Sequence, residues 1–371
     1  MPRDLQPLAG VRVLDATSNI AGPFGAAVLA DLGAQVTKLE SPLADPSRSM
    51  VPLDGDRSAY FHIVNRNKTA ITTDFKSLQG RAVFDQLLSE SDVFLTNFLP
   101  DRLNALSLSP ADLMAANPRL IYGNLTSYGA AGADASHPGY DATVQARTGV
   151  MYVTGESEGD PVRTGVSILD IGSGMWLAIG ILAAIVERNE SGLGCLIETS
   201  LYETGISWVS YHLTAYQLSE MPSVRSGTGH PTFAPYGNFP TLNGQICVGV
   251  GNDEIFAKFA NAVGGRQWIT DPRFAKNSGR VANKIELHAL IISALSTADA
   301  KYWVTQLGKV GVPCDLVVPP EALFQDPQQL AVGMLLANPD LESKVKLIPG
   351  IPVTFNGKRP QITKSAPHRN I

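Results

Sequence analysis

The Asp170 carboxylate, near the middle of the chain, lies in a sequence context that could support catalysis. Asp170 follows an apolar run in the stretch GVSILDIGSGMWLAIG and precedes a Gly-Ser-Gly sequence that leads into an apolar helix. An aspartate at such a place lies beside the unpaired backbone N–H groups of a helix start, so it can cap the helix. The same donors could steady an oxyanion beside a reactive carboxylate. From the residue types alone, capping is the favoured interpretation, because aspartate is a common N-cap residue.

Motifs for several other chemistries are missing from the sequence. The six histidines show no metal-ligand spacing and the three cysteines form no CxxC pair, so neither a metal site nor a disulfide framework is predicted. No GxGxxG occurs, which disfavours a dinucleotide enzyme. A net charge of −5 provides no basic field for nucleic acid. His230, within GTGHP, is the histidine of most interest because its segment is rich in glycine.

The first 125 residues alternate between strand and helix patterns. Strands are predicted at 11–14, 35–39, 69–73, 92–96 and 120–125, and helices at 22–33, 78–89 and 110–116. Such alternation predicts an α/β fold with a parallel sheet covered by helices. Ligands of these sheets bind beyond the carboxyl ends of the strands, so residues 16–23 and 97–102 are candidate ligand loops.

The length of 371 residues and the globular composition predict two domains. Residues 217–244 are rich in Ser, Gly, Pro and Thr, which is typical of a linker or a mobile active-site segment. Beyond them, a strand pattern at 246–250 and helix patterns at 253–262, 281–295 and 298–307 predict a smaller α/β lobe.

The sequence also indicates where the protein works. The N-terminus has no apolar signal-peptide core, and the longest apolar run, 175–186, is shorter than the roughly 20 residues that span a bilayer. Unpaired cysteines suit a reducing compartment. We therefore expect a soluble, cytoplasmic protein without a membrane partner.

Short motifs follow one another in a fixed order along nearly the whole chain. They are LAGVRVLDAT, ADLGAQVTKLESP, NRNKTAITTDFKS, TNFLPDRL, NPRLIYGNLTSYG, PGYDATVQARTG, DPRFAKN and GVPCDLV. In this order the chain resembles the class III CoA-transferases, the CaiB/BaiF family that includes formyl-CoA transferase and, as a branch, α-methylacyl-CoA racemase. One departure is the C-terminus, where the family usually carries an LGEHT-like stretch and this chain ends in SAPHRNI.

The resemblance implies a specific architecture. Residues 1–216 and 326–371 would form a large Rossmann-like, CoA-binding domain, and residues 245–325 would form the small domain. Residues 217–244 would be the linker, within which 226–238 is a candidate lid. The family further implies a homodimer whose two chains interlock.

The resemblance also reverses the interpretation of Asp170, which matches the family's nucleophilic aspartate. Moving CoA between acids without ATP requires a carboxylate that can form an acyl anhydride and then its own CoA thioester. The adjacent Gly172 and Gly174 could leave room for that thioester, or could serve close helix packing. Tyr140 and Asp141, in PGYD, match substrate-binding positions that could orient a carbonyl group by hydrogen bonding.

CoA and acyl-CoA are the implied substrates, and no permanently bound cofactor is expected. Two arginines of formyl-CoA transferase are replaced here by Ser41 and Ala105, so phosphate contacts could pass to Arg48, Lys68 or Arg102. Phe98 could instead be a core residue. The implied CoA-binding residues are Ile20 and Ala21, through main-chain groups, together with Lys76, Asn97, Phe98 and Arg102.

Two other functions remain open from the sequence: an α-methylacyl-CoA racemase or epimerase, and a non-catalytic acyl-CoA-binding protein. The racemase branch carries a GHD-like motif whose histidine acts as a proton-transfer base, whereas this chain has Gly139, Tyr140 and Asp141 there. Tyrosine has an ordinary pKa of about 10 and is a poor base at neutral pH. The sequence therefore favours CoA transfer, while the donor and acceptor acids stay open.

Overall fold

The computed structural model describes residues 6–75 and 77–369, which form two compact units. Unit 1 contains the residues up to Val150, Arg163–Gln217 and the residues from Phe324 onward, and unit 2 contains Met151–Val162 and Leu218–Leu323. The boundaries of both units differ from the predicted ones where the chain passes from one unit to the other. Residues 151–162 and nearly all of the predicted linker belong to unit 2.

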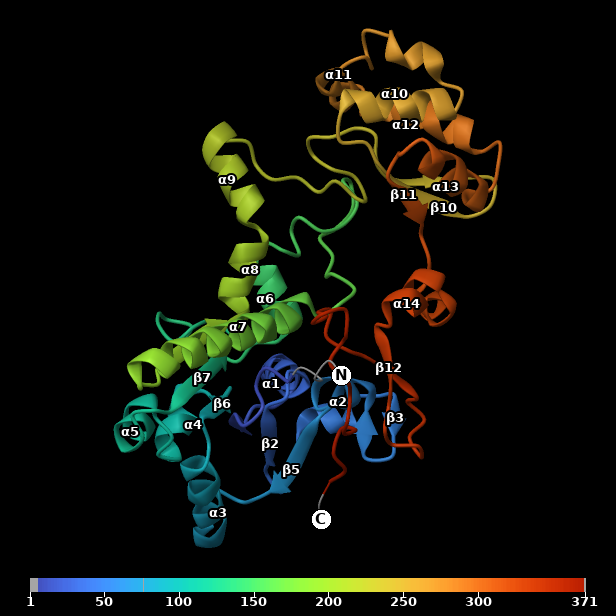
Figure 1. Ribbon diagram of the computed structural model, residues 1–371. Coiled ribbons are helices and arrows are strands. Elements are labelled where there is room, and N and C mark those ends of the chain that lie inside the picture. The colour runs from blue at the N-terminus through green and yellow to red at the C-terminus, as the bar shows by residue number, and fades with distance from the viewer. Residues whose placement is uncertain (1–5, 76, 370–371) are drawn as a thin grey trace. The chain divides into compact units, whose positions relative to one another are not determined.

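Unit 1 is built around a six-stranded sheet, of which β2, β5, β6 and β7 are labelled in Figure 1. All five neighbouring pairs are parallel, in the order β5-β2-β1-β6-β7-β8. Parallel strands need crossover connections, which the intervening helices provide. The predicted α/β parallel sheet is thereby confirmed, and β8 is a strand that the sequence patterns missed. The strands are β1 (Arg12–Asp15), β2 (Gln35–Glu40), β5 (Lys68–Thr72), β6 (Val93–Thr96), β7 (Ile121–Thr126) and β8 (Leu196–Ser200).

Helices cover both faces of this sheet because successive strand residues point to opposite sides. On one face Leu14, Phe94 and Tyr122 join a buried core with side chains from three helices. On the other face α7 packs over β7, where a Cβ added to Gly123 would meet Leu177 of α7. The first-face helices are α3 (Leu78–Ser89), α4 (Pro100–Ala105) and α5 (Pro110–Ala116), and the other face carries α1 (Ala21–Asp31) and α7 (Ile168–Ser191).

The long helix α7 extends well beyond the apolar run recognised in the sequence. It has 24 residues and is long and apolar enough to cross a membrane by length and composition alone. Half of its apolar window is buried inside the protein, and it packs against α1, β7 and β8. These contacts account for the buried half of its apolar residues as part of the core. Trp176, Ile179 and Val186 of the same helix are exposed.

In the rest of unit 1, the C-terminal segment of the chain packs against residues from its first part. The C-terminal segment contacts β4, since Arg57 donates to the carbonyl of Ala366 at 3.1 Å and to Asp340 at 2.7 Å. The remaining elements are η1 (Pro46–Ser49), β3 (Leu53–Asp54), β4 (Arg57–Ser58), α2 (Ala59–Val64), α6 (Asp141–Thr148), α8 (Leu201–Trp208), α9 (Ser210–Ser219), α14 (Pro327–Val332), β12 (Leu335–Ala337) and β13 (Leu347–Pro349), with η3 (Pro320–Gln325) at the junction.

Unit 2 is a three-stranded antiparallel sheet with helices packed on an apolar core of its own. Its first strand lies inside the segment predicted as linker, because the sequence YGNFP pairs with β10 despite its Gly and Pro. Such residues usually mark turns, which hid the strand from the sequence patterns. The elements are β9 (Tyr236–Pro240), β10 (Gln245–Gly249), β11 (Cys314–Leu316), α10 (Asp253–Ala262), η2 (Arg266–Ile269), α11 (Asn277–Ala282), α12 (Lys284–Leu295) and α13 (Ala300–Lys309).

Candidate active site

Asp170 lies in the first turn of α7, as its third residue, and not at the cap. The N-cap position belongs to Ser167, whose side chain makes no capping hydrogen bond. Within the described part of the chain, the Asp170 carboxylate accepts no hydrogen bond and forms no ion pair. The capping interpretation is therefore wrong. A half-buried carboxylate without a partner is costly unless it has a function.

The start of α7 is capped instead by Asp141, from the start of α6. One carboxylate oxygen of Asp141 accepts from the backbone N–H of Leu169 at 2.8 Å and of Asp170 at 3.2 Å. The other oxygen accepts from Gln145 at 2.5 Å, and Gln145 also bonds Thr164. These contacts occupy the two N–H donors that were predicted to steady an oxyanion. Asp141 thus holds the backbone on which Asp170 stands.

Burial raises the pKa of the Asp170 carboxyl to about 7, and the negative charge of Asp141 adds to the increase. The positive charge of Arg163 opposes this increase and lowers the pKa of Asp170. The Arg163 guanidinium lies 3.9 Å from the neighbouring Asp141 carboxylate. Perturbed carboxylates of this kind concentrate at functional sites, because burial and a like charge are costly to maintain. Near neutral pH, Asp170 therefore exists in both protonation states.

Two glycines bring the start of α1 against α7 one turn beyond Asp170. A Cβ added to Gly174 would lie 2.5 Å from the carbonyl oxygen of Ala21, and one added to Gly25 would lie 2.7 Å from that of Gly174. A Cβ on Gly172 would meet the Trp208 ring at 2.8 Å. The structure therefore shows these glycines in close helix packing, the second of the two predicted roles, and the space beside them is filled.

The loop before α1 was predicted to bind CoA through main-chain groups of Ile20 and Ala21. Ile20 is the N-cap of α1 and gives no side-chain cap, so the N–H groups of Ala21 and Gly22 have no side-chain partner among the described residues. Asn97, predicted as a direct CoA contact, bonds this loop. Its amide accepts from the N–H of Ser18 at 3.1 Å and donates to the Ser18 carbonyl at 2.9 Å.

The other predicted CoA-binding side chains behave in different ways. Phe98 is buried in the core of unit 1, so its alternative role in packing is the one observed. The guanidinium of Arg102 stacks on the Phe98 ring, 3.9 Å from its centre, and leaves its edge exposed. Lys76 lies outside the described residues. Of this group, Arg102 keeps the geometry of an anion-binding side chain.

Arg48 and Lys68 were predicted as alternative phosphate ligands, and the structure contradicts both predictions. Arg48 is buried and bonds Glu40 at 2.6 and 2.8 Å. Lys68 is buried and pairs with Asp15 at 2.8 Å. The sequence patterns did not show these pairs, because each carboxylate partner lies on a different element, Glu40 on β2 and Asp15 on β1.

Tyr140 lies at the N-cap of α6 with its side chain 70% exposed. It is one residue before Asp141, so the predicted PGYD pair separates into a buried carboxylate and an exposed ring. Tyr60 approaches the start of α7, where its hydroxyl lies 3.4 Å from that of the N-cap residue Ser167. Tyr140 is thus available to a ligand, while Asp141 is committed to the fold.

Residues 226–238, the candidate lid, are bonded within unit 2. Gly227 donates to the Gly155 carbonyl at 3.0 Å, and Asn277 donates to that of Thr232 at 2.8 Å. His230 accepts from the Thr232 N–H at 3.2 Å and lines a cavity of about 460 Å³ in this unit. Among the described residues, no His, Cys, Asp and Glu side chains converge as a metal site. The lid stays a prediction.

Sequence reasoning missed Gln145 and Arg163, which complete the surroundings of Asp170. Gln145 is fully buried and joins α6 to the irregular segment before α7. Arg163 is exposed, and apart from its long contact with Asp141 no described residue bonds its guanidinium. In the sequence, Gln145 lies four residues after Asp141 in PGYDATVQ, and Arg163 lies seven residues before Asp170 in VRTGVSILD. This proximity points to a shared site only once the fold brings the two segments together.

The sequence and the fold of this chain are both similar to those of known proteins. Residues 8–370 match the sequence model of CoA-transferase family III. The chain is 34% identical to the acetyl-CoA:oxalate CoA-transferase of Acetobacter aceti, over 95% of this chain and 90% of that protein. It is 34% identical to the succinate–glutarate CoA-transferase of Agrobacterium fabrum, over 95% and 89%. The crystal structure of a CaiB/BaiF family protein from Brucella suis matches with a TM-score of 0.88 and 32% identity, covering 98% of this chain and 97% of that one.

Proposed function

Since the chain belongs to CoA-transferase family III, we propose that it moves CoA from an acyl-CoA thioester to a free carboxylic acid through a covalent intermediate on Asp170. The observation that carries the intermediate is the unpaired, half-buried Asp170 carboxylate at the start of α7, whose pKa is raised to about 7. A carboxylate that is poorly solvated and not bonded is a stronger nucleophile than one held by donors.

The first half of the reaction transfers CoA to the enzyme. The ionised Asp170 attacks the thioester carbonyl, the carbon–sulfur bond breaks, and CoA leaves as a thiolate, which gives an acyl aspartyl anhydride. The thiolate then attacks the aspartyl carbonyl of this anhydride. The donor acid leaves as a carboxylate, and CoA is now held as a thioester of Asp170.

The second half repeats these steps with the acceptor acid. The acceptor carboxylate attacks the Asp170 thioester, which releases the CoA thiolate and forms a second anhydride. The thiolate attacks the acceptor carbonyl of that anhydride, so the new acyl-CoA forms and the Asp170 carboxylate is regenerated. No ATP is consumed, because each bond broken is replaced by one of similar energy.

Asp141 and Arg163 have different tasks around this carboxylate. Asp141 holds the first turn of α7 through the N–H groups of Leu169 and Asp170. Arg163 lowers the pKa of Asp170 and so increases the ionised, nucleophilic fraction near neutral pH. We propose that its exposed guanidinium also attracts the carboxylate of the acid substrate.

Replacing Arg163 with glutamine is expected to move the pH dependence of CoA transfer to higher pH. Transfer requires ionised Asp170, so kcat/KM rises with pH around a midpoint of about 7 in the wild type. Without the nearby positive charge, the pKa of Asp170 is higher and the midpoint rises by at least several tenths of a pH unit, about what one partly exposed charge contributes. The measurement is kcat/KM for acyl-CoA from pH 5.5 to 9.

Arg147→Gln is the matched control for this profile. Arg147 is another exposed arginine of unit 1, and it pairs with Asp134 at 3.3 Å and not with Asp141. Its variant should keep the wild-type midpoint. An unchanged midpoint in Arg163→Gln, or an equal shift in both variants, would contradict the role assigned to Arg163.

For CoA we propose the loop of residues 16–20 with the first turn of α1, together with Arg102. The start of α1 presents backbone N–H groups and the positive end of an 11-residue helix, which suit phosphate groups. The close packing of Gly174 on Ala21 places this turn beside the start of α7. A thioester bound along α1 would therefore meet the helix that carries Asp170.

CoA exchange separates transfer from the two other functions. Two of the similar proteins named above are CoA-transferases by name, one acting on acetyl-CoA and oxalate and the other on succinate and glutarate. We propose short dicarboxylic acids as the first substrates to test. Labelled acid should enter the acyl-CoA pool at a rate that depends on enzyme. Fast deuterium uptake at the α-carbon without CoA exchange would indicate a racemase, and binding without either reaction would indicate a silent CoA-binding protein.

We propose a homodimer, because unit 1 exposes an extensive apolar surface. The helix α9 buries none of its residues, and its aromatic side chains Tyr211 and Tyr216 are about half exposed. Trp176, Ile179 and Trp208 of the neighbouring helices are 41–50% exposed, and the two tryptophan rings lie 6.3 Å apart. Aromatic side chains of this kind are enriched where subunits meet.

A further inference from the structure

Side chains from three different places in unit 1 bond three consecutive residues of the loop before α1. Asn97, just after β6, bonds both polar backbone groups of Ser18, accepting at 3.1 Å and donating at 2.9 Å. A single side-chain amide thus fixes the peptide units before and after Ser18. The loop is held at its centre by a residue 79 positions away in the sequence.

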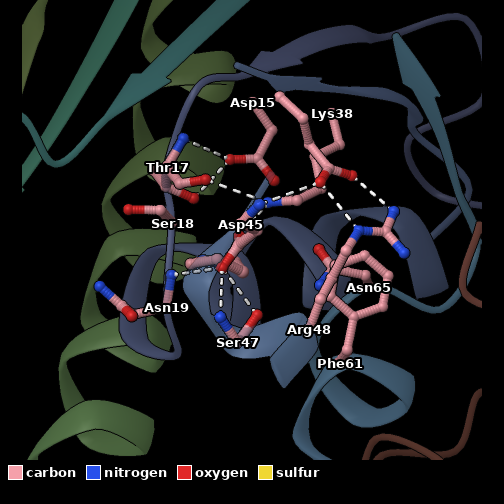
Figure 2. Close-up of polar contacts among 12 residues, drawn as sticks. Asp15, Thr17, Ser18, Asn19, Lys38, Asp45, Ser47, Arg48, Phe61 and Asn65 are labelled. Carbon is pink, nitrogen blue, oxygen red and sulfur yellow. Dashed lines mark hydrogen bonds and ion pairs between the residues drawn. The ribbon is translucent and has the colours of Figure 1, made fainter. Parts of the chain in front are cut away.

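The residues on either side of Ser18 are held by one buried ion pair. Lys38 of β2 donates to the Thr17 carbonyl at 3.1 Å, and Asp45 accepts from the Asn19 N–H at 3.1 Å. Lys38 and Asp45 are themselves 2.7 Å apart, with their side chains 0% and 1% exposed. Figure 2 shows this pair lying directly against the loop, with the Ser18 and Asn19 side chains pointing away from it.

The ion pair is in turn fixed by further buried partners. Asp45 accepts from the N–H and the hydroxyl of Ser47 at 2.9 and 2.7 Å. On the other side, Asp15 accepts from the Thr17 N–H at 3.0 Å and pairs with Lys68 at 2.8 Å. Figure 2 shows Asp15, Thr17, Lys38, Asp45 and Ser47 joined in one network. Because every member is bonded, the loop has little freedom to move.

Stability alone does not account for this network. Replacing a buried ion pair with well-packed apolar residues is often neutral or stabilising, so a charged pair here gives the fold no clear advantage. It does hold a backbone that would otherwise relax. Asn19 has a φ of +65°, a conformation that residues other than glycine rarely adopt, and its Oδ1 is buried without a partner among the described residues. The helix α1 begins two residues later.

We infer that Asn97, Lys38 and Asp45 are positioning residues that preset the loop of residues 17–19 for the nucleotide end of CoA. This inference rests on the proposed CoA-binding function. Asn97 thereby acts through Ser18 and does not need to touch CoA itself. Holding the loop in its bound conformation before CoA arrives removes the cost of ordering it on binding, so the effect falls on affinity.

The test is the replacement of Asn97 with alanine, which removes both bonds to Ser18 from a partly exposed position. The KM for acyl-CoA should rise by about 10- to 100-fold, the range expected for two hydrogen bonds. The kcat at saturating acyl-CoA should change by less than about threefold, since Asp170 is untouched. With an acyl-pantetheine, which lacks the nucleotide, kcat/KM should stay at the wild-type value.

Asp45 provides a second variant and α1 provides the control. Asp45→Asn keeps an oxygen that can accept from the Asn19 N–H, so its KM for acyl-CoA should lie between those of the wild type and of Asn97→Ala. Asp31→Asn breaks a similarly buried ion pair, 2.6 Å from Arg66, at the far end of α1. It should lower the unfolding midpoint and leave the KM for acyl-CoA unchanged.

Two results would overturn the inference. One is an unchanged KM for acyl-CoA in folded Asn97→Ala. The other is an equal loss with acyl-CoA and acyl-pantetheine, which would show general damage to the site. Failure of the proposed function would be visible separately, because the wild type would then show no CoA exchange and no preference for acyl-CoA over acyl-pantetheine.

Discussion

Asp170→Asn is expected to lower the rate of CoA exchange by about 10³-fold or more, the scale seen when a covalent nucleophile is removed. The amide cannot form the acyl anhydride, and no other described carboxylate lies unbonded at the start of α7. Asp141 cannot replace it, because both of its oxygens are bonded to other groups. The measurement is the exchange of labelled acid into acyl-CoA by purified, folded protein.

Asp134→Asn is the control for charge and substitution type. Asp134 lies in the segment just before α6 and pairs with Arg147, away from the bonds that hold α7. Its variant should keep near-normal exchange. Asp170→Ala should match Asp170→Asn and excludes recovery by deamidation of the asparagine. Near-normal exchange by either folded Asp170 variant would contradict the assignment.

The same Asp170→Asn substitution is expected to stabilise the fold at pH 8 by up to about 4 kcal/mol, the free energy that corresponds to the raised pKa of Asp170. Burial raises the pKa of Asp170 from 3.8 to about 7, so between these values the folded state binds a proton that the unfolded state has lost. The stability of the wild type therefore falls as pH rises from 4 to 7. Asparagine carries no such cost, and its advantage should disappear toward pH 4.

Urea unfolding of both proteins at several pH values between 4 and 8 measures this difference. Comparing variant and wild type at each pH cancels the titration of other carboxylates, such as Asp15 and Asp45. Asp134→Asn should show no advantage that grows with pH. If Asp170→Asn were no more stable than the wild type at pH 8, the carboxylate would have no raised pKa, and its burial would not be the source of its reactivity.

Local patterns predicted much of the fold. Strands β1, β2, β5, β6 and β7 lie within a residue or so of their predicted positions, and the helices at 78–89 and 110–116 match. Apolar periodicity and N-terminal Ser or Pro carry this information within a few residues. The strand β9 was missed because glycine and proline in YGNFP resemble a turn, and only pairing with β10 makes it a strand.

The candidate site was less predictable because its contacts are distant in sequence. Asp170 was recognised, but its cap comes from Asp141, 29 residues earlier. Arg48 and Lys68 look like surface cations until their carboxylate partners on β1 and β2 are known. Asn97 was assigned to CoA, whereas the structure shows it bonding Ser18. Residue type indicated which side chains matter, and only the fold showed what each one contacts.

Chemical trapping on the wild-type protein tests the central claim most directly. The enzyme would be mixed with an acyl-CoA donor in the absence of acceptor, treated with hydroxylamine and digested, and its peptides analysed by mass spectrometry. Hydroxylamine converts an activated carboxyl group to a hydroxamate and leaves free carboxylates unchanged. We predict a hydroxamate on Asp170 that depends on acyl-CoA and is missing in Asp170→Asn. An enzyme that exchanges CoA at full rate while the label appears on another residue, or on none, would contradict the account.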